Sequence, residues 1–418
     1  MSIFPWHPAT KRPGTLLVLP LCLLSVALAA PLPLNYAVEH YDVSITPDLA
    51  AKRLTGEVTI RFHSRITRLD ALELDAGALQ ILSVTDNQAP QWSERKGTLL
   101  IVVLTNPVRT GEHRSLTIRY QAGPAKGLVF FPDQVYTSFF TSDWMVSNDC
   151  PDEPATLRLQ IAAPPNLKVA ATERLESPTP PFLYAFAVGA FEESTSEVNG
   201  VKLRVLGHAS VFEPTSAALR FLAERSGHAY PGNTYTQVFA HGNVEQEAAG
   251  ITLLPESYGA DLAQHPANLW LLAHELAHQW YGIGIPCKDW SDFWLNEGLS
   301  TFLADAFLEQ RFGKARYQQE IERSRTIYEA LKADGKDRPL SYNDWETPQQ
   351  AGGQIPYHKG AWVLSQLRRQ LSDEVFWRGL RLYTSEHWGK PVTSEDFQKS
   401  METAAGKSLT KFFDRWVK

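Results

Sequence analysis

The chain has 418 residues, of which 44% are hydrophobic and 21% charged, a balance typical of globular proteins with room for two or three domains. Its formal net charge is -6 at pH 7, which gives no indication of a nucleic-acid partner. We therefore expect a folded protein that acts on other kinds of molecule.

The first 29 residues are typical of an export signal. Lys11 and Arg12 precede an apolar run over residues 15–29, which ends in Ala-Leu-Ala. This run is shorter than the roughly 20 residues that a membrane-spanning helix needs. We therefore expect residues 1–29 to be a cleaved signal peptide rather than a retained anchor. The mature protein would be exported, periplasmic or secreted, with no stable membrane span.

Two cysteines follow the predicted signal, Cys150 and Cys287. In an oxidising compartment they could form one disulfide, but two separate buried thiols explain the count equally well.

The next part of the chain has the pattern of β-strands. Apolar and polar residues alternate with a period of two, as in residues 41–45 and 57–62, and successive side chains of a strand point to opposite faces. Further strands are predicted at residues 99–104, 116–120, 157–161 and 184–188, and a loop at Pro178, Pro180 and Pro181. We predict a β-rich domain over residues 30–193.

Beyond residue 193 the periodicity changes, and from Pro266 onward it favours helices. A first helix is predicted over residues 266–282, and a second from the turn at residues 296–298 to Gly313. Later helices are predicted at residues 360–371, 374–387, 393–405 and 409–418. Residues 194–418 would form a mainly helical second domain, which makes the fold class α+β.

The first of these helices carries a metal-binding pattern, because residues 274–278 read His-Glu-Leu-Ala-His. His274 and His278 lie one turn apart on one helical face, at the separation that neighbouring ligands of a tetrahedral zinc ion need. A two-histidine pattern can arise by chance on a packed helix. Glu297, with 18 residues between it and His278, adds a third ligand at the start of the next helix and makes the zinc site specific.

This ligand set predicts a catalytic site rather than a structural one. Two histidines and one glutamate leave a fourth position for water, whose pKa zinc lowers to about 7. Glu275 lies beside the metal ligands without being one of them. It would act as the general base, taking a proton from the attacking water and passing it to the leaving amine.

Residues 274–282 and 290–298 together resemble the zinc segment of the aminopeptidase N family of zinc metallopeptidases, gluzincins that also include leukotriene hydrolase. Residues 149–154, Asp-Cys-Pro-Asp-Glu-Pro, resemble that family's Pro-Cys-Phe-Asp-Glu-Pro, so the resemblance covers nearly all of residues 36–418. It implies a saddle-like β-rich domain, a thermolysin-like catalytic domain and one zinc ion. The substrates would be peptides with a free N-terminus. We also expect a minimal form that lacks the family's C-terminal helical domain and has a more open cleft.

Two further segments resemble the family. Residues 242–246, Gly-Asn-Val-Glu-Gln, stand where relatives have Gly-x-Met-Glu-Asn, which implies that Glu245 binds the substrate's α-ammonium group. Gly242 could let the substrate backbone approach closely. Residues 357–360, Tyr-His-Lys-Gly, resemble the family's Tyr-Glu-Lys-Gly, which implies that Tyr357 donates a hydrogen bond to the developing oxyanion. A surface glutamate and a packed tyrosine are the alternatives.

One segment departs from the family. Residues 137–140, Thr-Ser-Phe-Phe, stand where relatives have Thr-Gln-x-Glu, so Ser138 and Phe140 replace polar groups near the substrate's first residue. A thermolysin-like endopeptidase with an open cleft therefore remains an alternative, as does a weakly active peptide-binding relative. Epoxide hydrolysis, the activity of one branch of the family, has no positive feature in this chain.

Overall fold

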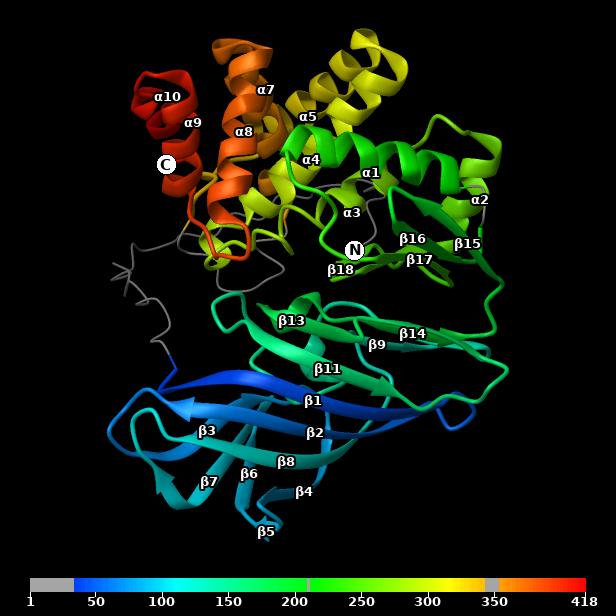
Figure 1. Ribbon diagram of the computed structural model, residues 1–418, viewed down its shortest axis with the longest axis vertical. Helices are drawn as coiled ribbons and strands as arrows, with labels where there is room; N and C mark the ends of the chain where they lie inside the picture. Colours follow the sequence, from blue (N-terminus) through cyan, green and yellow to red (C-terminus); the bar gives the residue numbers. More distant parts are fainter. Residues whose placement is uncertain (1–33, 209–210, 343–352) are drawn as a thin grey trace, which may run out of the picture.

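The computed structural model describes residues 34–208, 211–342 and 353–418. The predicted signal peptide lies outside these residues. Figure 1 shows a lower half built of β-strands, a second sheet above it, and a layer of helices on top. The predicted order, a β-rich part followed by a mainly helical part, is confirmed.

The N-terminal half contains three sheets. The largest has seven strands in the order β13-β11-β1-β2-β8-β4-β5, and the others have the orders β3-β7-β6 and β12-β14-β10-β9. The strands are β1 (Tyr36–Asp48), β2 (Arg53–Ser64), β3 (Leu69–Asp75), β4 (Gln80–Asp86), β5 (Ala89–Pro90), β6 (Trp92–Lys96), β7 (Leu99–Val108), β8 (His113–Ala122), β9 (Leu128–Phe130), β10 (Gln134–Thr137), β11 (Ala155–Ile161), β12 (Lys168–Ala171), β13 (Arg174–Thr179) and β14 (Phe186–Gly189).

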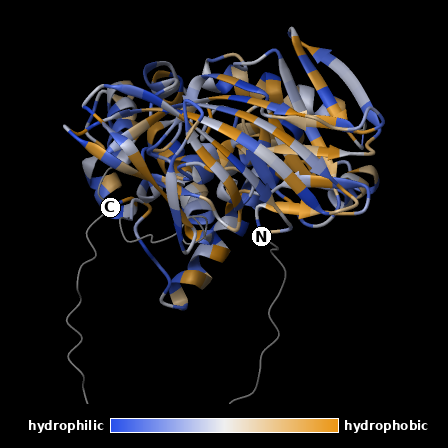
Figure 2. Ribbon diagram, turned by 90° about the horizontal axis from the view of Figure 1, so that it is seen from below, coloured by the Kyte–Doolittle hydropathy of each residue, from blue (hydrophilic) through white to orange (hydrophobic). Residues whose placement is uncertain are grey.

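The alternating pattern of these strands sorts their side chains between two faces. In β2, Leu54, Val58, Ile60 and Phe62 are fully buried, whereas the alternate residues are partly or largely exposed, namely Thr55, Glu57, Thr59 and Arg61. Figure 2 shows the same alternation of hydrophobic and hydrophilic residues along the strands. One face of the large sheet therefore packs on the core and the other faces solvent.

A five-stranded sheet opens the second half, in the order β15-β16-β17-β19-β18. Its strands are β15 (Glu193–Val198), β16 (Val201–Leu206), β17 (Thr234–Ala240), β18 (Gln246–Ala248) and β19 (Ile251–Pro255). The predicted domain boundary after residue 193 thus falls at the first residue of β15. Strands β16, β17 and β19 run parallel, and β18 pairs antiparallel with β19 at the sheet's edge.

The helices pack above this sheet (Figure 1). They are α1 (Phe212–Ser226), α2 (Glu256–Gln264), α3 (Trp270–Ala277), α4 (Trp294–Phe312), α5 (Lys314–Ala333), α7 (Gly360–Leu371), α8 (Asp373–His387), α9 (Ser394–Ala405) and α10 (Thr410–Trp416), with a π-helical turn, η5 (Ile355–Lys359), before α7. The last four helices lie within a residue or two of their predicted bounds. No helix in the described part of the chain is long and apolar enough to cross a membrane.

Several predicted bounds are wrong for local reasons. Helix α3 begins later than residue 266, because a backbone bond from Asn268 to the His265 carbonyl closes a separate turn. Helix α4 begins before the predicted turn, so Glu297 lies in its first helical turn. Pro178 lies within β13 rather than in a loop, which is possible because β13 is an edge strand. Cys150 and Cys287 are both free thiols.

Candidate active site

The three predicted metal ligands meet in the helical half. His274 lies in α3, His278 directly follows that helix, and Glu297 comes from α4. The two Nε2 atoms are 3.1 Å apart, and each lies 3.5 Å from Glu297 Oε2. Zinc–ligand bonds of about 2.0–2.1 Å in a tetrahedron separate neighbouring ligand atoms by about 3.4 Å. The three side chains therefore fit one zinc ion.

The ring orientations leave both Nε2 atoms available for a metal. His278 Nδ1 lies 3.2 Å from the Tyr281 carbonyl and 3.2 Å from Ser300 Oγ, and His274 Nδ1 lies 3.4 Å from Thr301 Oγ1. Such contacts at the far ring nitrogen fix the tautomer of a metal-binding histidine. Both hydroxyl residues come from α4, the helix that also supplies Glu297, so α4 contacts both histidines as well as carrying the third ligand.

Burial and charge act differently on the two histidines. Burial lowers the pKa of His274 to about 4, which keeps this imidazole neutral. For His278, burial also acts to lower the pKa, but the charges of Glu297 and Glu247 outweigh it and raise the pKa to about 10. Without a metal, a proton on His278 balances the negative charges. A metal ion would replace that proton, so binding should be favoured by higher pH.

Glu275 lies between the two histidines in the sequence and is buried, with 5% of its surface exposed. Its Oε2 has no hydrogen-bond partner among the described residues. Burial, and next the charge of Glu247, raise the pKa of Glu275 well above its ordinary value. A buried carboxyl group of raised pKa next to a metal site is suited to accept and donate protons.

Tyr357 is brought to the same centre by the π-helical turn η5. Its ring stacks on His274, with ring centroids 5.7 Å apart and an interplanar angle of 22°. Burial, followed by the negative charges of Glu297, Glu247 and Glu275, raises the pKa of Tyr357 well above its ordinary value. The hydroxyl group therefore keeps its proton and can act as a hydrogen-bond donor.

A further carboxylate, which the sequence did not single out, lies at this centre. Glu247 belongs to the edge strand β18 and is 4% exposed, and its Oε1 has no hydrogen-bond partner among the described residues. Burial raises its pKa to about 7. Its negative charge also raises the pKa values of His278, Glu275 and Tyr357.

The amide of Gln279 holds this strand against the zinc-site helix. Gln279 directly follows His278, and its Nε2 donates to the Ala248 carbonyl at 2.9 Å while its Oε1 accepts from the Gly250 N–H at 3.0 Å. These two bonds fix the end of β18 next to the metal ligands. Sequence spacing does not single out Glu247, because its place at the centre depends on this long-range contact.

The predicted substrate residues Glu245 and Gly242 lie just before β18. Glu245 is half-buried, burial raises its pKa, and its charge acts on Glu275. Gly242 is exposed and has φ +82°, with Tyr136 and Phe131 beside it. A left-handed turn is thus one reason for glycine at this position. The roles of both residues toward a substrate remain predictions.

The segment that departs from the family has an unusual backbone. Phe139 and Phe140 have φ values of 46° and 42°, a left-handed conformation that bulky residues rarely adopt. Gly127 packs against this turn, since a Cβ on Gly127 would lie 2.3 Å from the Phe140 carbonyl oxygen. Two aromatic residues therefore occupy a strained turn, which is the kind of backbone that persists where surrounding packing enforces it.

Two imidazoles and a carboxylate that fit one zinc ion, with a buried Glu next to the ligands, define a metallohydrolase centre of the catalytic type. Comparison with known proteins agrees with this class. Residues 212–416 match the peptidase family M1 domain and residues 37–201 match the peptidase M1 N-terminal domain. The chain belongs to peptidase family M1.

Its relatives include aminopeptidases. Aminopeptidase 2 of Candida albicans is 25% identical over 93% of this chain and 47% of its own length. Probable aminopeptidase 1 of Sulfurisphaera tokodaii is 31% identical, over 43% of this chain and 24% of its own length. The chain thus spans about half the length, or less, of these curated relatives.

A similar fold is found in an M1 zinc metallopeptidase from Deinococcus radiodurans. The TM-score is 0.78 with 23% sequence identity, and the likeness covers 92% of this chain and 94% of that one. A variant of that enzyme was solved with a Tyr-Ser-Ala substrate. At this identity the comparison concerns the fold alone.

Proposed function

We propose that this protein is a zinc aminopeptidase that hydrolyses the first peptide bond of peptides with a free N-terminus. The observation that carries the proposal is the pairing of the His274, His278 and Glu297 ligand set with a buried carboxyl group at Glu275. The aminopeptidases among the relatives of this chain support the same choice.

A zinc ion held by His274, His278 and Glu297 would supply a Lewis acid and lower the pKa of water to about 7. Glu275 accepts a proton from the attacking water and passes it to the departing amine. Tyr357 donates a hydrogen bond from its hydroxyl group to the oxygen on which negative charge develops. The three ligands and Glu275 are buried, which strengthens the electrostatic interactions among them.

The choice of an exopeptidase depends on a carboxylate for the substrate's ammonium group. A fixed carboxylate near the metal pairs with a terminal ammonium and so places the first peptide bond over the zinc site. Glu245 is the predicted partner, and we add Glu247, because its buried carboxylate is electrostatically coupled to His278, Glu275 and Tyr357 alike. We therefore expect Glu245, Glu247 or both to bind the substrate's ammonium group.

The zinc-peptidase part of the proposal is tested with Glu275→Gln. This variant keeps the three metal ligands and the size of the side chain, but it removes the proton acceptor. We expect unchanged zinc content and a loss of peptide hydrolysis of about 100-fold or more, together with loss of wild-type activity on chelation. Full activity in Glu275→Gln would contradict the assignment of the base.

Two alternatives to an aminopeptidase predict different results. A thermolysin-like endopeptidase would cut within peptides whether or not the N-terminus is blocked. A peptide-binding relative would hold zinc and bind peptides without turnover.

Based on the signal-like residues 1–29, we further propose that the protein is exported to the periplasm or secreted. Cell fractionation tests this proposal.

A further inference from the structure

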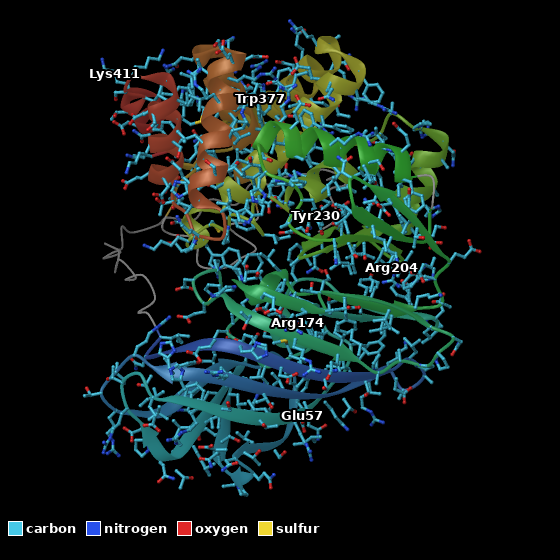
Figure 3. The ribbon with its side chains drawn as sticks, viewed as in Figure 1. Glu57, Arg174, Arg204, Tyr230, Trp377 and Lys411 are labelled. Carbon is cyan, nitrogen blue, oxygen red and sulfur yellow. The ribbon has the colours of Figure 1, made fainter. Side chains whose placement is uncertain are left out.

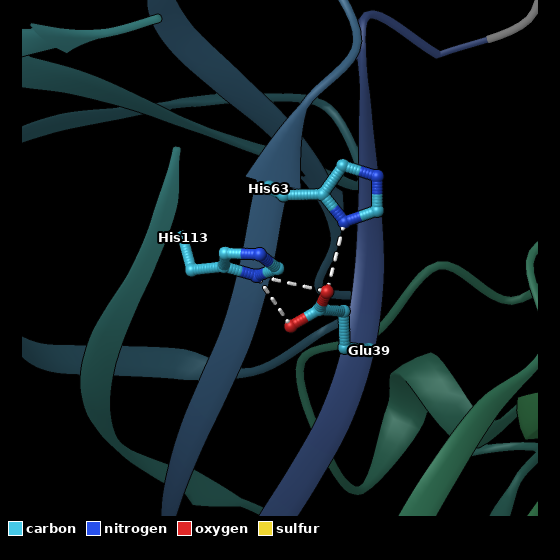
Figure 4. A group of neighbouring side chains, drawn as sticks. All are labelled: Glu39, His63 and His113. Atoms are coloured by element: carbon cyan, nitrogen blue, oxygen red, sulfur yellow. Dashed lines mark hydrogen bonds and ion pairs between the residues drawn. The ribbon is translucent and has the colours of Figure 1, made fainter. Parts of the chain in front are cut away.

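Three ligand-type side chains meet far from the catalytic ligands in the sequence, on the large sheet of the N-terminal half. They are Glu39 of β1, His63 of β2 and His113 of β8, which come from three adjacent strands (Figure 4). His63 and His113 stand directly opposite each other in the antiparallel pair of β2 and β8. Side chains of such a pair lie on the same face of a sheet.

A bulge in β1 directs Glu39 toward the two histidines. The register between β1 and β2 shifts between Val38 and His40, so Glu39 is the extra residue. Val38 and Tyr41 are buried, whereas Glu39 and His40 are both half-buried and face away from the core. Bulges of this kind re-aim a side chain. Here the re-aimed side chain is the carboxylate that both histidines contact.

The ligand atoms lie close enough to share one ion. His63 Nδ1 is 3.0 Å from Glu39 Oε1, and His113 Nδ1 is 2.9 Å from the same oxygen and 3.0 Å from Oε2. All three ligand atoms lie within 4.8 Å of one another. Two imidazoles and one carboxylate form a set that suits zinc and copper ions, and its composition equals that of the catalytic ligands. The partly exposed side chains leave room for water as a further ligand.

In the protein without an ion, hydrogen bonds hold the cluster together. Partial burial acts to raise the pKa of Glu39, but hydrogen bonds from His113 and His63 and the charges of His113 and Arg61 lower it below its ordinary value. The carboxylate is therefore ionised. An ion would replace the protons on the two Nδ1 atoms.

Arg61 is the one cationic competitor that contacts this carboxylate within the described residues. Its Nε lies 3.1 Å from Glu39 Oε2, but 59% of its side chain is exposed. An exposed ion pair of this kind contributes little to stability. The arginine side chain can therefore turn into solvent when a metal ion takes its place.

We propose that Glu39, His63 and His113 form a second metal site, which binds a divalent transition-metal ion of the zinc class and links strands β1, β2 and β8. This site is separate from the catalytic ligands and does not depend on the proposed peptidase activity. An ion that binds only the folded state would stabilise the N-terminal half. The site is thus structural in role.

The test is a zinc count on the full chain, after dialysis against zinc buffered by a chelator in the low micromolar range. We compare wild type with His63→Gln/His113→Gln, and we use His40→Gln as the matched control. His40 lies on the same face, with its Nδ1 2.7 Å from Thr156 Oγ1. Wild type and the control should each hold one more zinc ion per chain than the double variant.

Equal zinc counts in wild type and the double variant would overturn the proposal. Glu39→Gln, which keeps both histidines, serves as a second variant should the double variant fail to fold, and it should also hold less zinc than wild type. As a second readout, added zinc should raise the unfolding temperature of wild type more than that of either variant. Failure of the proposed function would instead appear as inactivity in every variant, with the difference in zinc count unchanged.

Discussion

The acidic residues at the catalytic centre differ in how closely they are coupled to the metal ligands. Glu275 and Glu247 are buried, whereas Glu245 is half-buried. The charge of Glu247 raises the pKa of His278 and of Tyr357. The charge of Glu245 also raises the pKa of Glu275, but three other charged residues affect that pKa more strongly. Because Glu247 is more deeply buried and more strongly coupled to the centre than Glu245, we expect it to contribute more to substrate binding.

We expect Glu247→Gln to lower kcat/KM for a peptide with a free N-terminus more than Glu245→Gln does. Loss of a charge-assisted bond to a buried ammonium group costs about 2–3 kcal/mol, or about 30- to 150-fold. Steady-state kinetics of the two variants, matched in charge and size, measures the contrast. A loss confined to Glu245→Gln would assign the ammonium group to Glu245 alone.

A second residue-scale expectation concerns Asp149. Its Oδ1 is buried without a hydrogen-bond partner among the described residues, and burial raises its pKa to about 7. The folded state therefore keeps a proton that the unfolded chain loses near pH 4, so this group lowers stability as pH rises from about 4 to 7. The loss should reach up to about 4 kcal/mol at neutral pH.

Asp149→Asn removes this effect while it keeps the shape of the side chain. The free energy of unfolding of the variant, relative to wild type, should rise steadily between pH 4 and 7 in urea titrations. A constant difference between the two proteins over this range would show that Asp149 is ionised in the folded state.

At the scale of elements, the catalytic centre depends on a close contact between α4 and the segment that carries Tyr357. A Cβ on Gly298 of α4 would lie 3.0 Å from Gly360 Cα and 3.0 Å from the Pro356 carbonyl oxygen. Both obstacles are backbone atoms, which do not yield as a flexible side chain would. Glycine at residue 298 thus allows Glu297 and Tyr357 to approach each other.

Gly298→Ala should lower stability by about 1–3 kcal/mol, since overpacking forces the two segments apart. It should also reduce kcat by about 10-fold or more, because the Tyr357 hydroxyl moves away from its place at the centre. Denaturant unfolding and kinetics measure the two effects. Gly123→Ala is the control, because a Cβ there meets nothing within 4 Å; equal behaviour of the two variants would refute the close-contact account.

At the same scale, the sequence predicts elements well where their pattern is simple. The helices after residue 360 and the strands around residues 99–120 fall close to their predicted places, because their apolar periodicity is regular. The predicted start of α3 is wrong because a hydrogen-bonded turn precedes the helix. The predicted start of α4 is wrong because its first turns are buried on all sides and show no simple apolar periodicity. Helices α1, α2 and α5 were not predicted individually.

The same limit applies to the site. The spacing of His274, His278 and Glu297 suffices for the ligand set, since helix geometry converts sequence spacing into distance. The contribution of Glu247 depends on strand β18 lying beside α3 through Gln279, a long-range contact that spacing does not encode. The bulge that aims Glu39 at His63 and His113 is hidden for the same reason.

The whole molecule consists of a β-rich half and a mainly helical half, which Figure 3 shows with their side chains. The candidate catalytic centre lies in the second half. The described chain spans about half the length of the Candida relative. Its proposed activity therefore rests on the centre itself. The central claim is that this centre removes residues from free peptide N-termini.

The measurement that tests this claim most directly is hydrolysis of a matched pair of peptides, one with a free N-terminus and one N-acetylated, with the products identified by mass spectrometry. We predict stepwise removal of N-terminal residues from the free peptide, no hydrolysis of its acetylated twin, and loss of activity on chelation. Internal cleavage of both peptides at equal rates would contradict this claim and identify an endopeptidase.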